Sequence, residues 1–113
     1  ALRGLQIVVA DPAAAAERYE RLLGCAARDE GGARVLSLGC ETLELLTPAG
    51  FAARFGRPAP AHPGPAALQV EVADLPACGA LLAAAGVDVA RSPRGGLLVG
   101  PADAGQVVLE FLG

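Results

Sequence analysis

Two strand-like stretches each carry one carboxylate among apolar residues. The run 107–112 places Glu110 between leucine and phenylalanine, and the run 42–46 places Glu44 between two leucines. Side chains alternate between the two faces of a strand, so each carboxylate shares a face with apolar neighbours. A carboxylate in such surroundings is costly unless it is hydrated, paired or used in a site. Both residues are therefore candidate functional groups.

The rest of the chain repeats one pattern around these two strands. Residues 4–11 read Gly-Leu-Gln-Ile-Val-Val-Ala-Asp and residues 67–74 read Ala-Leu-Gln-Val-Glu-Val-Ala-Asp. In both copies the Asp is a favourable N-cap, which predicts helices over about 13–23 and 75–85, ended by Gly24 and Gly86. Three short extended runs follow each helix. We therefore predict an α+β fold of tandem βαβββ units, unit one spanning 1–48 and unit two 66–113.

A proline-rich stretch, 49–65, separates the units. It holds Phe51, Arg54, Phe55 and the only histidine, His62. Residues 49–55 can form a helical turn, whereas the prolines after it forbid regular structure. The stretch is either a plain spacer or a lid whose two phenylalanines cover a pocket, because long loops in compact domains are often functional.

Composition narrows the function classes. At 113 residues, with 53% hydrophobic and 19% charged residues, the chain is expected to fold as a single domain. A net charge of −3 and a pI near 5.0 argue against nucleic acid as a partner. No apolar run reaches the ~18 residues of a membrane span, so no membrane partner is expected. Three cysteines without a C-x-x-C pair favour a reduced, cytoplasmic protein.

Strand alternation also assigns faces. Leu5, Ile7 and Val9 are expected to meet the first helix. Gln6 and Gln69, at equivalent positions of the two copies, are expected on the opposite face together with Glu44 and Glu110. Gly4 and Ala67, two residues earlier in each copy, share that face.

Four motifs recur in order along the chain: Val9-Ala-Asp-Pro with Tyr19 and Leu22-Leu-Gly24, Leu43-Glu-Leu-Leu46, Val72-Ala-Asp74 with Gly86, and Leu109-Glu-Phe111. Together these motifs resemble the vicinal oxygen chelate superfamily, which includes glyoxalase, bleomycin-resistance and extradiol dioxygenase domains. The resemblance covers essentially the whole chain. It implies a half-barrel-like cavity with helices on the outer faces, and a homodimer.

The resemblance also implies where a divalent metal would be bound. Metal-dependent members use one residue on the first strand and one on the last strand of each unit. The last-strand positions are Glu44 and Glu110, which match. The first-strand positions, seven residues before each cap Asp, are Gly4 and Ala67, where a metal-binding member commonly has His. Two of four ligands are therefore lost, and the two small residues are expected to leave extra room for a ligand.

The predicted site admits several interpretations. No metal or other cofactor is expected, although Glu44 and Glu110 are able to hold a hard divalent ion weakly, with help from the amide oxygens of Gln6 and Gln69. His62 is able to join only if its loop folds back. Two facing carboxylates also suit acid–base chemistry or a ligand amine or hydroxyl. Alternatively, they lie at hydrated rims or pair with nearby arginines without chemical role: Arg3, Arg54 or Arg57.

Three functions follow. The first is a protein that binds a small organic molecule through a degenerate metal site, with ligand-binding residues Gln6, Glu44, Phe51, Arg54, Phe55, Gln69 and Glu110. The second is a metal-dependent lyase or dioxygenase in which Glu44 and Glu110 are catalytic or metal ligands. The third is a non-catalytic subunit or interaction module that keeps only the fold.

Overall fold

A computed structural model describes residues 1–60, 65–102, 104 and 107–113. The first half contains β1 (Leu2–Val8), α1 (Pro12–Leu23), β2 (Ala27–Glu30), β3 (Ala33–Leu38) and β4 (Glu41–Leu46). After α2 (Pro48–Phe55), the second half contains β5 (Pro65–Glu71), α3 (Leu75–Ala84), β6 (Val89–Arg91), β7 (Leu97–Val99) and β8 (Val108–Leu112). The predicted order β-α-β-β-β is thus present twice. His62, the histidine considered for the site, lies outside the described residues.

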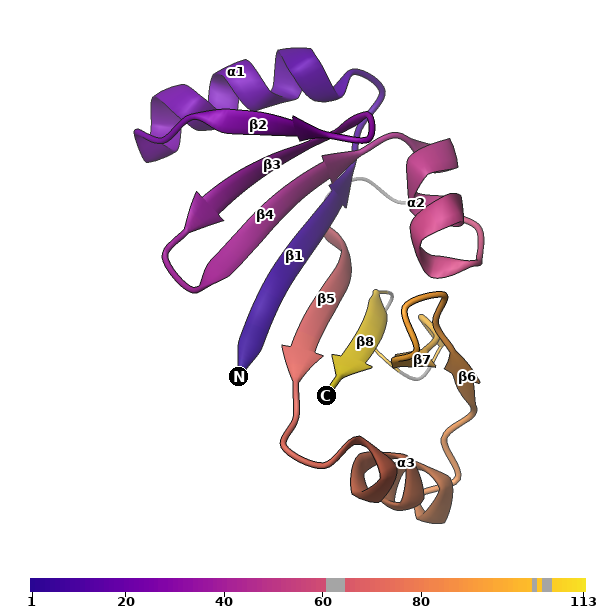
Figure 1. Cartoon of the computed structure of the whole chain (residues 1–113). Helices are drawn as coiled ribbons and strands as arrows, with labels where there is room; N and C mark the ends of the chain where they lie inside the picture. The colour runs from indigo at the N-terminus through magenta and orange to yellow at the C-terminus, as the bar shows by residue number, and fades with distance from the viewer. Residues whose placement is uncertain (61–64, 103, 105–106) are drawn as a thin grey trace.

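All eight strands form one sheet in the order β2-β3-β4-β1-β5-β8-β7-β6. The first strands of the two halves, β1 and β5, pair antiparallel at its centre. Each also pairs in parallel with the last strand of its own half, β1 with β4 and β5 with β8. The sheet fans out around this centre, with α1 and α3 at its two ends (Figure 1). The expected tandem α+β architecture is confirmed.

Helix α1 begins and ends where the sequence predicts. The Asp11 carboxylate accepts hydrogen bonds from the backbone N–H groups of Ala13 and Ala14 at 3.1 and 3.2 Å. Gly24 ends the helix with φ of 69°, a conformation that glycine adopts without steric cost. The buried residues Ala15 and Ala16 pack with Leu5 and Ile7 of β1, which confirms the predicted helix-facing side of that strand.

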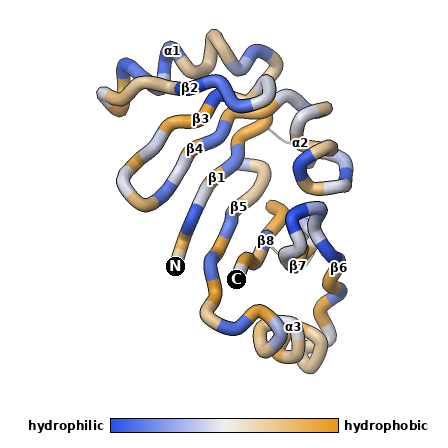
Figure 2. Tube along the Cα trace, viewed as in Figure 1, coloured by the Kyte–Doolittle hydropathy of each residue, from blue (hydrophilic) through white to orange (hydrophobic). Residues whose placement is uncertain are grey.

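Helix α3 differs from its counterpart. The sequence places Cys78, Leu81, Leu82 and Ala85 at helical spacing, which predicts an apolar stripe. The helix nevertheless has no buried residue, and Leu81 is 73% exposed. Helix Leu75–Ala84 carries no charged residue, so its sequence does not define a solvent-facing side opposite the apolar one. Figure 2 shows the contrast between the mixed colouring of α1 and the mostly apolar α3.

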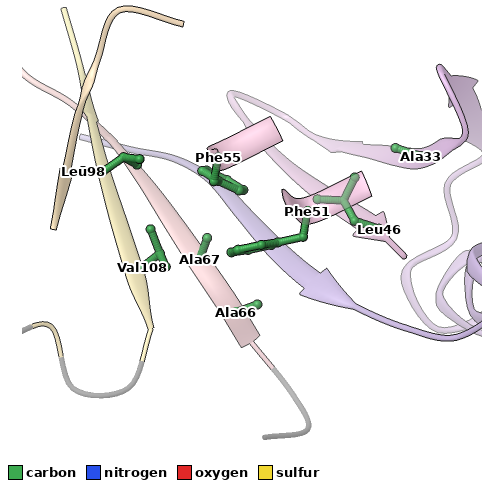
Figure 3. Close-up of a cluster of buried hydrophobic side chains, with 8 residues drawn as sticks. All are labelled: Ala33, Leu46, Phe51, Phe55, Ala66, Ala67, Leu98 and Val108. Carbon is green, nitrogen blue, oxygen red and sulfur yellow. The ribbon is translucent and has the colours of Figure 1, made fainter. Parts of the chain in front are cut away.

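Helix α2 lies inside the stretch predicted as a linker. Thr47 caps it by accepting a hydrogen bond from the Gly50 N–H at 3.1 Å, and Pro48 occupies its first turn. Phe51 and Phe55 are 0% and 1% exposed, with ring centroids 4.6 Å apart. Figure 3 shows both rings reaching from α2 toward β5 and β8. They join a core cluster with Ala33, Leu46, Ala66, Ala67, Leu98 and Val108.

Candidate functional site

Four polar side chains meet at the centre of the sheet. The register places Gln6 opposite Glu44 and Gln69 opposite Glu110. All four are buried, with exposed fractions of 0%, 6%, 3% and 0% respectively. The structure thus brings the predicted amides and carboxylates onto one face, as strand alternation predicts. Glutamine and glutamate are rarely buried without partners, so their hydrogen bonds define the site.

The amides connect the two carboxylates. The Gln6 Nε2 group donates to Glu44 Oε1 at 2.9 Å and to Gln69 Oε1 at 2.8 Å. The Gln69 Nε2 group then donates to Glu110 Oε1 at 2.8 Å. A continuous chain of hydrogen bonds therefore runs across the junction of the two halves, from Glu44 to Glu110. We call these four residues the central relay.

Arg54 extends the relay at one end only. Its guanidinium donates to Glu44 Oε2 at 2.6 Å, and the two side chains are 19% and 8% exposed. The pairing of Glu44 with Arg54 is one of those considered from sequence. Arg3 instead pairs with Glu71, and in the described part of the chain Glu110 has no ion-pair partner. The internal repeat is therefore not symmetric, because α2 supplies one cation to one of the two carboxylates.

Two buried oxygens of the relay lack a hydrogen-bond partner among the described residues: Gln6 Oε1 and Glu110 Oε2. Buried acceptors of this kind cost free energy unless a donor reaches them. Of the two carboxylates, Glu110 is the less satisfied, because one of its oxygens lacks a donor whereas both oxygens of Glu44 are engaged.

The space beside Gly4 is already filled. A Cβ built on Gly4 would lie 2.7 Å from Gln69 Oε1, 3.2 Å from Gln6 Nε2 and 3.2 Å from Thr42 Oγ1. Ala67 is fully buried in the cluster that contains the two phenylalanines of α2. The expectation of extra room at these two positions is therefore wrong. The relay amides fill the first position, and core packing surrounds the second.

A pocket of about 590 Å³ opens over the Glu44 side of the relay. We call it the first pocket. Glu44 and Gln69 line it, whereas Gln6 and Glu110 are not among its lining residues. Its other polar lining residues, which sequence reasoning did not select for the site, are Arg3, Arg28, Glu30, Cys40, Thr42 and Arg94.

The first pocket draws these residues from several elements. Cys40 is exposed in the turn between β3 and β4. Arg94 comes from the turn between β6 and β7. Phe51 and Phe55 line none of the described pockets and belong to the core.

A second pocket of about 510 Å³ lies beside α2. It is lined by the turn between β2 and β3, the start of α2, and the turn that carries Arg94. Arg54 lines this pocket, and Arg94 lines both pockets. The Arg54–Glu44 ion pair thus has its cation at one pocket and its carboxylate at the other.

Comparison with solved structures identifies the fold. Methylmalonyl-CoA epimerase from Mycobacterium tuberculosis superposes with a TM-score of 0.66 over 97% of this chain and 85% of its own, at 24% identity. A hypothetical protein from Bacillus halodurans C-125 superposes with a TM-score of 0.70 over 98% of this chain and 91% of its own, at 19% identity. The S115T variant of Streptomyces coelicolor methylmalonyl-CoA epimerase, in complex with 2-nitronate-propionyl-CoA, superposes with a TM-score of 0.65 over 98% of this chain and 92% of its own, at 20% identity.

These similarities establish the fold, which is the βαβββ glyoxalase-like fold of these neighbours. At these identities they do not carry an activity across. No protein-family model matches the sequence, and no curated protein does. In the described residues, no helix is long and apolar enough to cross a membrane.

Proposed function

We propose that this chain is a glyoxalase/bleomycin-resistance-like protein that binds a small organic molecule in the first pocket without a divalent metal. The observation that carries the proposal is the central relay. It joins Glu44 to Glu110 through amide groups, and the resemblance to the superfamily implies that metal-dependent members use these two carboxylate positions as ligands.

The donor set does not fit a divalent ion. Gly4 and Ala67 offer no side-chain ligand, and a side chain at Gly4 would collide with the Gln69 amide. Both oxygens of Glu44 already accept from nitrogen donors, one of them cationic. Mg²⁺ and Ca²⁺ take about six or more oxygen ligands, and Zn²⁺ prefers nitrogen and sulfur. Among the described residues, no three His, Cys, Asp or Glu side chains cluster as a metal site would require.

The first pocket suits a small molecule instead. Its volume of about 590 Å³ falls within the range of ligand sites, ~300–1,000 Å³. Glu44 and Gln69 would provide acceptor and donor groups, and Thr42 a hydroxyl. Because Glu44 is held by Arg54 and Gln6, it would meet a ligand without reorganising. If the bound molecule reacts, Glu44 is the carboxylate in position to exchange a proton with it, and Glu110 acts through Gln69.

The structural neighbours suggest the first ligands to test. One of them is described as methylmalonyl-CoA epimerase in complex with methylmalonyl-CoA and NH4+. Acyl-CoA thioesters are therefore reasonable first probes for this chain. The metal-dependent lyase or dioxygenase remains the alternative hypothesis, and the fold-only interaction module remains the third.

Two measurements test the proposal. In calorimetric titrations with Mg²⁺ or Mn²⁺, we expect no uptake at micromolar concentrations. Micromolar uptake that Glu44→Gln or Glu110→Gln abolishes would instead establish the metal-dependent alternative. In the presence of a chelator, methylmalonyl-CoA or a related thioester should slow alkylation of Cys40, the exposed thiol that lines the first pocket. Cys25→Ser and Cys78→Ser substitutions leave Cys40 as the single reporter.

A screen of organic ligands that never protects Cys40 would favour the interaction module. We also propose that the chain is a cytoplasmic homodimer, with the exposed apolar helix α3 available to a second copy. Light scattering after size exclusion gives the mass in solution, and a monomer mass at working concentrations would contradict the dimer.

A further inference from the structure

The second pocket has an unusual charge balance. Two arginines line it, Arg54 and Arg94, and its described lining residues include no carboxylate. The remaining lining is small or neutral, with Gly31, Gly32, Thr47 and Gly50 prominent. The whole chain, by contrast, has a net charge of −3. A concave site lined by one sign of charge focuses the field and attracts ions of the opposite sign.

The Arg54 guanidinium is held by structure and keeps donors to spare. Arg54 stands on α2, which Phe51 and Phe55 anchor in the core. Its recorded bond to Glu44 uses Nη1, and a guanidinium has five N–H donors in a planar fork. Arg54 can therefore pair with Glu44 and still donate into the second pocket.

Arg94 is carried by a turn with defined hydrogen bonds. The Ser92 backbone N–H donates to the Gly96 carbonyl at 2.9 Å, and the Gly96 N–H donates to the Ser92 hydroxyl at 2.8 Å. Ser92 itself is 5% exposed. Within the described residues, Arg94 has no ion-pair partner. A hydrogen-bonded turn thus carries a cation that lines both pockets.

We infer that the second pocket binds the oxyanion group of a small organic anion, a carboxylate or phosphoryl group held by Arg54 and Arg94. Guanidinium groups match both oxyanions in geometry and charge. Because Arg94 lines both pockets, the same molecule extends its body into the first pocket, over Glu44 and Gln69. The inference rests on the proposed function and names the chemical class of its ligand.

Calorimetry with two small probes tests the inference. Pyrophosphate and succinate are titrated into the whole chain in the presence of a chelator, at constant ionic strength. We expect at least one probe to bind, and the tighter one identifies the oxyanion as phosphoryl or carboxylate. Arg94→Gln should weaken binding roughly tenfold to a hundredfold, which is the loss of a charge-assisted hydrogen bond. Arg91→Gln, an exposed arginine on β6 that lines neither pocket, should leave binding unchanged.

Three outcomes would overturn the inference: no binding of either probe at millimolar concentration, an Arg94→Gln variant that binds like the parent, or equal weakening by Arg91→Gln. Arg54→Gln should also weaken binding, and the Arg94 comparison stands even if that variant folds poorly. The proposed function fails separately. If a probe binds in the presence of the chelator, and metal titrations separately show micromolar Mg²⁺ or Mn²⁺ uptake that Glu44→Gln abolishes, the oxyanion subsite stands and the metal-free account falls. If thioesters protect Cys40 while neither probe binds, the proposed function stands and the oxyanion subsite falls.

Discussion

Substituting Gly4 with alanine places one methyl group at the most crowded point of the site. The new Cβ would lie 2.7 Å from Gln69 Oε1, closer than carbon and oxygen approach without a shift. That oxygen accepts the 2.8 Å hydrogen bond from Gln6 Nε2. The substitution therefore acts on the central relay directly, and nothing else near Gly4 is as close.

The expected magnitude follows from opposing terms. Alanine in place of glycine inside a strand is favourable by about 0.5–1 kcal/mol. Overpacking a filled interior costs about 1–3 kcal/mol, and a buried group left unpaired costs about 1–3 kcal/mol. The two costs describe one displacement and overlap at about 1–3 kcal/mol, so after the gain is subtracted we expect a net loss of about 0.5–2 kcal/mol in the free energy of unfolding. This corresponds to a fall in Tm of roughly 2–10 °C for a domain of this size.

Urea unfolding followed by circular dichroism measures the loss, and a double-mutant cycle identifies its cause. In a Gln69→Ala background the closest atom is gone, so Gly4→Ala should become neutral or slightly stabilising. If Gly4→Ala in the parent chain is as stable as glycine, the reasoning is refuted. The Gln69 amide would then give way to a methyl group beside Gly4 without loss.

Three further substitutions follow from the same contacts. Arg54→Leu leaves the buried Glu44 carboxylate without its cation and should lower the free energy of unfolding, measured in urea, by about 3 kcal/mol. Adding Glu44→Gln to this variant should recover much of that loss. Equal stability of parent and Arg54→Leu would mean that the pair is not formed. Asp11→Ala removes the N-cap of α1 and should lower the free energy of unfolding by about 1 kcal/mol. Asp11→Asn caps the helix equally well, so its stability should stay near that of the parent. Equal losses in the two variants would contradict the capping hydrogen bond. Phe55→Ala empties part of the core under α2 and should cost about 3–5 kcal/mol, and a loss below 1 kcal/mol would place the ring outside the core.

Local sequence rules predicted the elements and the face of the site. The two Asp-capped helices and the period of two along the strands each depend on neighbours a few residues away. Because each first strand pairs in parallel with the last strand of its own half, the repeat also brought Gln6 opposite Glu44 and Gln69 opposite Glu110. The internal repeat was thus the strongest signal for the centre of the sheet.

These local rules do not predict contacts between segments that are far apart in the sequence. Arg54 reaches Glu44 because α2 docks its two phenylalanines between the halves, and nothing in the local pattern of a proline-rich stretch encodes that docking. Arg94 arrives from a hairpin turn of the other half. The filling of the space beside Gly4 depends on how the amide of Gln69 packs across the strand pair, which residue size alone does not reveal.

The relay itself can be observed through its amide protons. The glutamines of the chain are Gln6, Gln69 and Gln106, and it has no asparagine, so the side-chain NH₂ signals in an NMR spectrum are few and readily assigned by substitution. With stoichiometric paramagnetic Mn²⁺, the account predicts that the Gln6 and Gln69 side-chain signals stay sharp and exchange slowly with water, because both amides are buried and bonded to Glu44 and Glu110. Selective broadening of those two signals by stoichiometric Mn²⁺ would place a metal ion at the centre of the sheet and contradict the account.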